Sequence, residues 1–131
     1  VGVGRHLLDS AVAYAKERQQ FGRAIGSFQG LQWKLVDAAL ELERAASAVA
    51  WAAMCVDADT DDADAAVHSA KLEAGTAARR CARTSLQVHG GIGYTWEHGL
   101  HFWLRRAYAG DAFMGSSDYH ARCLAGLLFV A

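Results

Sequence analysis

Proline is absent from all 131 residues of this chain, and cysteine occurs only three times. Without proline, no position lacks a backbone N–H donor or blocks a helical turn, which favours long uninterrupted helices. The charged residues nearly balance to a formal net charge of −1, so no basic surface indicates a nucleic acid or an acidic membrane as a partner. The longest apolar run, residues 124–131, is far too short to span a membrane.

The cysteines Cys55, Cys81 and Cys123 are widely spaced and lie outside any Cys-x-x-Cys arrangement. Such a set is typical of buried thiols in a reducing compartment, so we expect a cytoplasmic protein. The chain opens at Val1 without a methionine or an export signal, and its first residues already show helical periodicity. We therefore expect it to be part of a larger protein.

Apolar residues recur at helical spacing along most of the chain. Residues 1–20 predict an amphipathic helix, and residues 19–27 interrupt the pattern, with Ser27 as the expected cap of the next helix. From Phe28 onward, apolar residues cover two faces of a long second helix, which should pack against two neighbours. The acidic residues 57–62 then form a solvated link.

Small residues line a third helix, predicted at about residues 63–88, and allow neighbouring helices to approach closely. Thr95 is the expected cap of a fourth helix that ends near Ala109, and Ser116 or Ser117 caps a fifth. No segment shows convincing strand alternation. The sequence therefore predicts one all-α domain over residues 1–131, an antiparallel, up-and-down bundle of four to five helices.

Residues 87–95 place a glycine-dense turn directly behind the third helix. Glycines there are most often a helix C-cap followed by a tight turn. The alternative is a ligand site, because backbone N–H groups without side chains can approach a phosphate or a ring edge. Both interpretations stay open on this segment alone.

Other constellations favour structural roles. The glutamates lack a histidine three residues on, which excludes the Glu-x-x-His signature of a di-iron or di-manganese bundle. His98 and His101 share a helical face, and such a pair is more often solvated or at the edge of a core than a metal site. The glycines around Gly91 follow a helix rather than a strand, unlike a dinucleotide-binding fingerprint.

Three ordered segments nevertheless resemble one family closely. Residues 14–22 (YAKERQQFG), residues 25–29 (IGSFQ) and residues 87–95 (QVHGGIGYT) are similar to successive signatures of the C-terminal helical domain of acyl-CoA dehydrogenases. The match covers essentially the whole chain. The resemblance implies a flavoenzyme that removes two hydrogens from the α and β carbons of an acyl-CoA thioester, with two further domains upstream.

The resemblance also implies the residues that contact FAD. Arg18 corresponds to an arginine that reaches the pyrophosphate of FAD held by a neighbouring subunit, and its planar charged fork suits that anion. The other implied FAD contacts lie on the same three segments and before the last helix: Gln19, Gln20, Phe21, Phe28, Gln29, Gln87, Val88, His89, Gly90, Gly91, Ser116, Ser117 and Asp118. FAD would then be shared across the interface of a dimer or tetramer.

The sequence departs from the family at the loop before the last helix. Most members carry there a glutamate that abstracts the α-proton, whereas this chain has Met114 followed by Gly115. A thioether is not a base, so no catalytic residue is assigned. The resemblance leaves Met114 and Gly115 as substrate contacts, because the backbone N–H of residue 114 can still polarise a thioester carbonyl.

Three explanations for Met114 remain open. The base lies upstream of Val1, or the chain is the non-catalytic partner in a mixed assembly, or it is a structural or binding module. Residues 96–98 and 104–106 resemble the bacterial steroid side-chain branch, which forms such mixed assemblies. Asp111 and Asp118 lie nearby, but we expect capping or solvated roles for both. The implied partners are an acyl-CoA, a homo- or hetero-oligomer, and electron-transfer flavoprotein or a similar electron acceptor.

Overall fold

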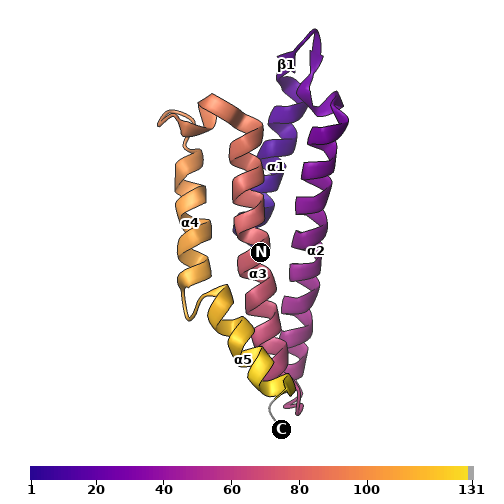
Figure 1. Ribbon diagram of the computed structural model, residues 1–131, viewed down its shortest axis with the longest axis vertical. Coiled ribbons are helices and arrows are strands. Elements are labelled where there is room, and N and C mark those ends of the chain that lie inside the picture. The colour runs from indigo at the N-terminus through magenta and orange to yellow at the C-terminus, as the bar shows by residue number, and fades with distance from the viewer. Residues whose placement is uncertain (130–131) are drawn as a thin grey trace.

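The computed structural model describes residues 1–129 and contains five α-helices in that range. They are α1 (Gly2–Glu17), α2 (Gln29–Asp57), α3 (Ala63–His89), α4 (Leu100–Ala112) and α5 (Ser117–Phe129) (Figure 1). Two short strands, β1 (Gln19–Gln20) and β2 (Arg23–Ala24), and two 3-10 turns, η1 (Ile25–Ser27) and η2 (Gly90–Tyr94), lie between helices. The predicted all-α bundle is confirmed.

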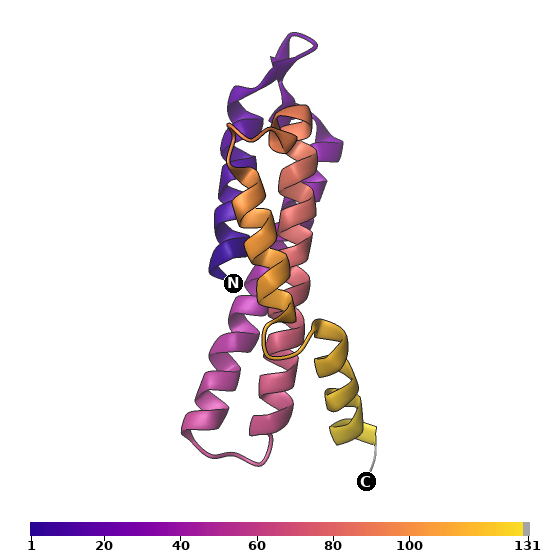
Figure 2. The same cartoon turned by 90° about the vertical axis from the view of Figure 1, so that its left-hand side faces the viewer.

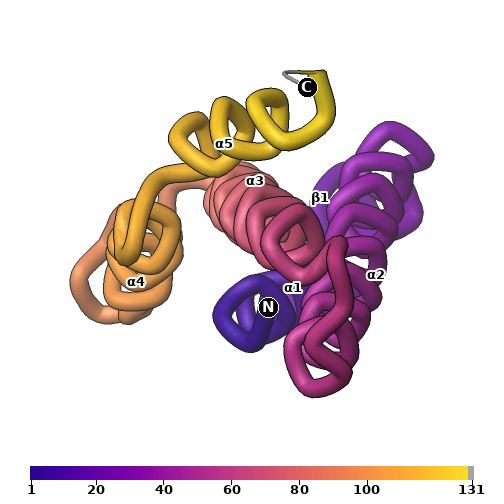
Figure 3. The backbone as a smooth tube through the Cα atoms, turned by 90° about the horizontal axis from the view of Figure 1, so that it is seen from below, coloured from indigo at the N-terminus to yellow at the C-terminus, as the bar shows by residue number. Residues whose placement is uncertain are grey.

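Helix α3 is the centre of the bundle. Figure 3 shows it surrounded by α1, α2, α4 and α5, and it contacts each of these four helices. The lower halves of α2 and α3 extend beyond α1 as a pair, and α5 lies along the other side of α3 (Figure 2). Helix α3 therefore connects parts of the chain that are otherwise separate.

The core is made mainly of small residues, as the sequence of the third helix predicts. Leu7, Leu42 and Cys81 are its largest apolar side chains without exposed surface, and alanines fill most of the remaining positions. Alanine carries no long side chain to separate two helices, so α1 and α2 approach α3 closely. Cys55 is buried as expected, whereas Cys123 is only half-buried, which corrects that part of the prediction.

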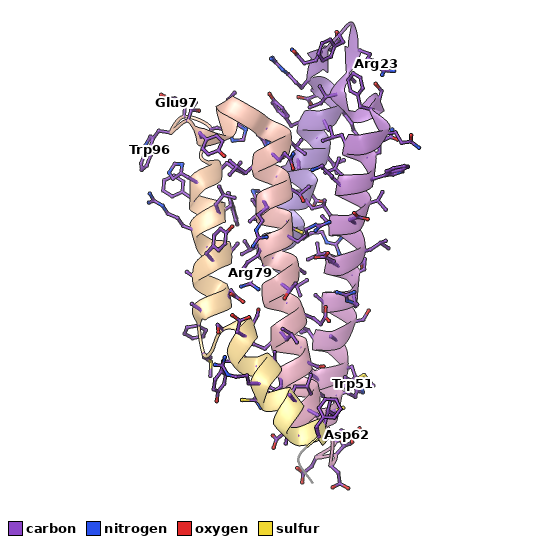
Figure 4. The ribbon with its side chains drawn as sticks, viewed as in Figure 1. Arg23, Trp51, Asp62, Arg79, Trp96 and Glu97 are labelled. Atoms are coloured by element: carbon purple, nitrogen blue, oxygen red, sulfur yellow. The ribbon has the colours of Figure 1, made fainter. Side chains whose placement is uncertain are left out.

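The outer face of α2 is not covered by any described residue. Trp33, Leu40 and Met54 are 62%, 65% and 69% exposed, and Trp51 lies near the lower end of the same helix (Figure 4). The sequence predicts two apolar faces on this helix. Within residues 1–129 only one of them is buried, against α3 and α1, and the other is exposed. Apolar surface of this extent is typical of a protein–protein contact.

Two predicted helix caps are wrong. The Ser27 hydroxyl donates to the carbonyl of Ala24, within the preceding turn, and Phe28 precedes α2 without a side-chain cap. The Thr95 hydroxyl donates to the carbonyl of Ile92 at the end of η2, while Gly99, with φ of 71°, is the residue that precedes α4. In both cases the hydroxyl closes the turn before it, a competing local bond that serine and threonine commonly make. Ser116 is confirmed as a cap, since it accepts from the N–H of Tyr119.

The small hairpin of β1 and β2 was not predicted. Its strands have two residues each, too short for an alternating pattern to appear in the sequence. Helix α1 accordingly ends at Glu17, three residues earlier than predicted, where Arg18 turns extended. Among the described residues, no helix is both long and apolar enough to cross a membrane.

Candidate functional site

The hairpin at the upper end of the bundle is built by a two-residue turn. Gln19 pairs with Ala24 and Gln20 pairs with Arg23 in antiparallel register. Phe21 and Gly22 form the turn with φ of 54° and 74°. Positive φ at both central residues gives the twist that matches paired strands, which explains why a tight hairpin forms here. Figure 4 shows Arg23 at this end of the molecule.

Aromatic and cationic side chains stiffen the hairpin. The Phe21 and Phe28 rings meet edge to face with centroids 6.2 Å apart, and the Arg23 guanidinium lies 4.1 Å from the centre of the Phe28 ring. Such contacts hold the two strands against the start of α2. Phe21 nevertheless stays 91% exposed, a large apolar ring displayed at the tip.

Arg18 lies where α1 passes into the hairpin. Its N–H donates to the carbonyl of Tyr14 at 2.9 Å, and its carbonyl accepts from the N–H of Ile25 at 2.8 Å. Its backbone is thus fixed at both ends. The guanidinium, in contrast, forms no ion pair with any residue in the range 1–129, unlike that of Arg5 or Arg44, which pair with Glu43 and Glu73.

Two glycines, Gly90 and Gly91, lie at the end of α3 next to the hairpin, and the structure accounts for them differently. Gly90 has φ of 61° and ψ of −137°, a conformation that only glycine adopts readily. Gly91 has no positive φ, and a Cβ added there would meet no atom within 4 Å. Nothing in residues 1–129 therefore requires glycine at position 91, and its bare backbone faces open space.

His89 is buried beneath this turn. Its ring Nδ1 donates to the carbonyl of Ser85 at 2.8 Å, and the rings of Tyr14 and His98 lie 4.6 Å and 4.5 Å from it. Burial lowers the pKa of His89, and the neighbouring His98 adds to that effect, against the opposing bond to Ser85. A neutral His89 thus ties α3 to α1.

These parts enclose a hollow of about 430 Å³ between α1, the hairpin and the end of α3. The hollow brings together five of the predicted FAD contacts with three apolar or aromatic neighbours; its lining residues are Arg18, Gln20, Val88, His89 and Gly91, with Tyr14, Ile25 and Ile92. The last three were not predicted as contacts, because nothing in the sequence distinguishes an aromatic or apolar side chain that lines a hollow from one that packs in a core.

The remaining predicted contacts at this end lie around the hollow rather than in its wall. Gln19, Phe21, Phe28 and Gln29 lie on the hairpin and at the start of α2. The side chain of Gln87 points to α2, where it accepts from the Lys34 ammonium at 2.9 Å. Gln87 and Lys34 line a neighbouring depression of about 220 Å³ together with Arg80, Arg83 and Thr84.

The second region is the loop between α4 and α5. Met114 has φ of 57° and is 78% exposed, and Gly115 follows with φ of 101°. Left-handed backbone at a non-glycine residue costs about 1–2 kcal/mol, so the surrounding contacts must hold Met114 in place. The N–H of Met114 meets no acceptor among residues 1–129.

Three side chains of α3 and α5 hold this loop. The Lys71 ammonium donates to the carbonyls of Asp111 and Gly115 at 2.8 Å and 2.9 Å. His120 binds the carbonyl of Met114 at 3.0 Å, and His68 binds His120. No sequence pattern points to these residues, because their partners lie 40 or more positions away or are backbone atoms.

Asp111 is neither solvated nor a cap, which corrects the expectation for it. It is 8% exposed, and its carboxylate accepts from Arg79 at 2.9 Å and from the hydroxyl of Ser117. Figure 4 shows Arg79 on α3 where α4 passes alongside. Asp118 is exposed in the first turn of α5, as expected. Ser117 is 1% exposed, and its hydroxyl is engaged by Asp111 within the chain.

The two regions lie at opposite ends of α4 (Figure 1). That helix has 13 residues, and a rise of 1.5 Å per residue separates its ends by about 20 Å. The chain therefore does not bring Met114 and Gly115 next to Arg18 and Gly91.

No group of three or more potential metal ligands exists among residues 1–129. His98 and His101 each have a buried ring nitrogen without a partner in that range. The His98 ring packs on His89, and the His101 ring stacks on Trp96 with centroids 4.1 Å apart. Trp96 and Glu97 lie on the loop that precedes α4 (Figure 4). Both histidines are part of aromatic packing at this end.

Comparison with known sequences matches residues 1–128 to the acyl-CoA dehydrogenase C-terminal domain. The acyl-CoA dehydrogenase FadE34 of Mycobacterium tuberculosis (strain ATCC 25618 / H37Rv) is 41% identical over 128 residues, which are 96% of this chain and 18% of FadE34. This chain thus spans about a fifth of the length of that relative.

Solved structures agree with this assignment. One protein of the ChsE4–ChsE5 complex from Mycobacterium tuberculosis superimposes with a TM-score of 0.91 at 30% identity, over 99% of this chain and 35% of that one. The FAD complex of PigA superimposes with a TM-score of 0.88 at 31% identity, over 95% of this chain and 32% of that one. The helical bundle is therefore an arrangement found within larger proteins, one of them in a complex with FAD.

Proposed function

This chain belongs to the acyl-CoA dehydrogenase family, as its C-terminal domain, and from that premise we propose that it serves a flavoenzyme that oxidises an acyl-CoA thioester. The reaction removes a proton from the α carbon and a hydride from the β carbon, and leaves a double bond between them. FAD, when bound, supplies the acceptor for the hydride. The role of this domain is to hold part of the cofactor, part of the thioester and the subunit interface.

The hollow between α1, the hairpin and α3 fits the FAD pyrophosphate. Arg18 brings an unpaired guanidinium to its wall, and Gly91 offers backbone with open space where a Cβ would stand. A charged fork and bare N–H groups are the usual means of binding a diphosphate. Because these groups have no partner within residues 1–129, we assign them to a cofactor shared with another domain or subunit.

The loop between α4 and α5 fits the thioester carbonyl. The N–H of Met114 is free of acceptors within the described chain, and the backbone around it is held by Lys71 and His120. A fixed N–H aimed at a carbonyl oxygen stabilises the negative charge that develops there as the α-proton leaves. Met114 and Gly115 would thus position the substrate without acting as a base.

The missing base makes a non-catalytic subunit the second candidate. Met114 occupies the position of the family's glutamate, and the nearest buried carboxylate, Asp111, is bound by Arg79 and Ser117. A carboxylate engaged in this way is a poor substitute base. One related structure is a complex of two different proteins, ChsE4 and ChsE5, which supports a mixed assembly in which the partner supplies the glutamate.

The exposed apolar face of α2 supports an oligomer. Within the described chain Trp33, Leu40 and Met54 are exposed, and contact with another protein surface would bury them. Aromatic and Met side chains are enriched at such contacts. We propose that a dimer or tetramer buries this face and that electron-transfer flavoprotein or a similar acceptor reoxidises the flavin. We also propose a cytoplasmic location, which the free thiols at Cys55 and Cys81 support.

The cofactor assignment is tested with Arg18→Ala in the complete enzyme. Loss of a charge-assisted bond to the pyrophosphate should cost about 1.5–3 kcal/mol of FAD affinity. The dissociation constant of FAD is measured by titration of the apoenzyme. The matched control is Lys16→Ala, which removes an exposed cation two residues away. Equal FAD affinity in both variants would assign Arg18 to the solvated end of α1.

The missing base is tested with Met114→Glu. General-base catalysis contributes about a hundredfold to ten-thousandfold, so the variant purified alone should gain acyl-CoA-dependent reduction of an electron acceptor. Met114→Gln is the control, since it has similar size and no basic carboxylate. Robust activity of the unmodified protein alone would contradict the silent-subunit proposal and indicate a base elsewhere in the enzyme.

A further inference from the structure

Two histidines that the family resemblance does not mention meet beside the loop between α4 and α5. His68 projects from α3 and His120 from α5, and their Nδ1 atoms are 2.8 Å apart. The other nitrogen of His120, Nε2, is 3.0 Å from the carbonyl oxygen of Met114. His120 is 7% exposed, so water competes little for either nitrogen.

The carbonyl of Met114 fixes where the protons are. A carbonyl oxygen only accepts, so Nε2 of His120 carries the hydrogen of that bond. In a neutral ring the remaining nitrogen, Nδ1, then has a lone pair and accepts. The hydrogen between the two rings therefore belongs to Nδ1 of His68, which donates to His120. The bonds run in one direction, from His68 through His120 to Met114.

The His120 ring also fills the space next to Gly115. A Cβ on Gly115 would lie 2.9 Å from Nε2 of His120 and 2.7 Å from a ring carbon of Tyr119. On the other side, Lys71 donates to the carbonyl of Gly115 at 2.9 Å. The two peptides on either side of Gly115 are thus both held: His120 of α5 binds the Met114 carbonyl of the first, and Lys71 of α3 binds the Gly115 carbonyl of the second. These contacts help Met114 to keep its positive φ.

We propose that the His68–His120 pair is a positioning device for residues 113–116, which fixes the Met114 carbonyl and so keeps the N–H of Met114 directed toward a thioester. Neither histidine touches the substrate. The thioester part rests on the proposed function, whereas the positioning part concerns this chain alone. Replacement of His120 by glutamine keeps an N–H donor at the same reach, and replacement by leucine removes it.

The first experiment tests the direction of the bonds by NMR on the ¹⁵N-histidine-labelled 131-residue chain at neutral pH. We expect a scalar coupling across the hydrogen bond between the Nδ1 atoms of His68 and His120. We also expect nitrogen shifts that show the Nδ1–H form of His68 and the Nε2–H form of His120. The absence of the coupling, or the opposite tautomers, would overturn the proposal.

The second experiment measures backbone order in the loop. The heteronuclear NOE of the Met114 and Gly115 amides should fall to values of a mobile loop in His120→Leu and should stay near that of the unmodified chain in His120→Gln. The control is His6→Gln, which replaces an exposed histidine of α1 that stacks on Trp103 of α4. It should change neither amide. A loop that stays ordered in His120→Leu would overturn the proposal, since the bond would then position nothing.

The third experiment links the pair to the thioester in the complete enzyme, with acetyl-CoA as the probe. The dissociation constant, measured by calorimetry, should rise about tenfold in His120→Leu, the equivalent of one hydrogen bond, and should stay within about twofold in His120→Gln. Unchanged binding in His120→Leu overturns the thioester part. If the unmodified enzyme binds no acetyl-CoA, the thioester part falls together with the proposed function, and the NMR results still decide the positioning part.

Discussion

Gly75→Ala should destabilise the bundle even though it places the best helix former inside a helix. Gly75 lies in the middle of α3, next to Asp111 at the end of α4 and Ser117 at the start of α5. A Cβ at this position would stand 2.1 Å from a carboxylate oxygen of Asp111 and 2.4 Å from the hydroxyl of Ser117. Both distances are far below van der Waals contact, so Asp111 or α3 must move.

The magnitude follows from three opposing effects. Alanine in a helix interior is favoured over glycine by about 1 kcal/mol. Overpacking a core costs about 1–3 kcal/mol, and a weakened bond between Asp111 and Arg79 costs up to about 1.5–3 kcal/mol more. The net loss should be about 2 kcal/mol of unfolding free energy, which lowers the midpoint of thermal unfolding by roughly 8 °C for a chain of this size.

Urea unfolding followed by circular dichroism measures this loss. The control is Gly126→Ala in α5, where an added Cβ meets no atom within 4 Å. The control should be neutral or more stable by up to about 1 kcal/mol. If Gly75→Ala were as stable as Gly126→Ala, the close packing of α4 and α5 on α3 would be refuted.

Two further predictions concern buried polar groups. Arg79→Met leaves the Asp111 carboxylate buried without its cation and should cost about 3 kcal/mol in urea unfolding; Arg79→Met combined with Asp111→Asn should recover part of that loss, and no recovery would argue against the pair. Burial lowers the pKa of His89, so the unfolded chain takes up that proton first, and stability should be full above about pH 6.5 and should decline below it. His89→Asn should reduce this decline between about pH 6.5 and 5; an unchanged slope would mean that His89 contributes nothing to it.

The sequence predicts the helices well because their cause is local. Absence of proline, abundant alanine and apolar spacing act within a few residues, so α2 and α3 were found with their link. Caps were less predictable, because a hydroxyl such as that of Ser27 or Thr95 can bind the turn before it as well as the helix after it. A hairpin with two-residue strands leaves no periodic signal.

The candidate site was predicted as separate motifs and not as an arrangement. Arg18 and Gly91 were found through their resemblance to a family, but that they share one hollow depends on how α1 and α3 pack. The expectation for Asp111 failed for the same reason: its partner Arg79 lies 32 residues earlier, on another helix. Such pairs have no fixed spacing in a sequence.

By itself, then, the sequence determined the helical class and the family, since each depends on residue identity or on near neighbours. The replacement of the usual base by Met114 stays a prediction from the family resemblance. Only the tertiary structure decided that α3 is central, that Lys71, His68 and His120 hold the loop at Met114, and that one face of α2 stays uncovered within residues 1–129. The physical reason is that burial and long-range hydrogen bonds form only when helices pack together. Small, alanine-rich helix surfaces allow many packing arrangements, and the polar contacts select one of them.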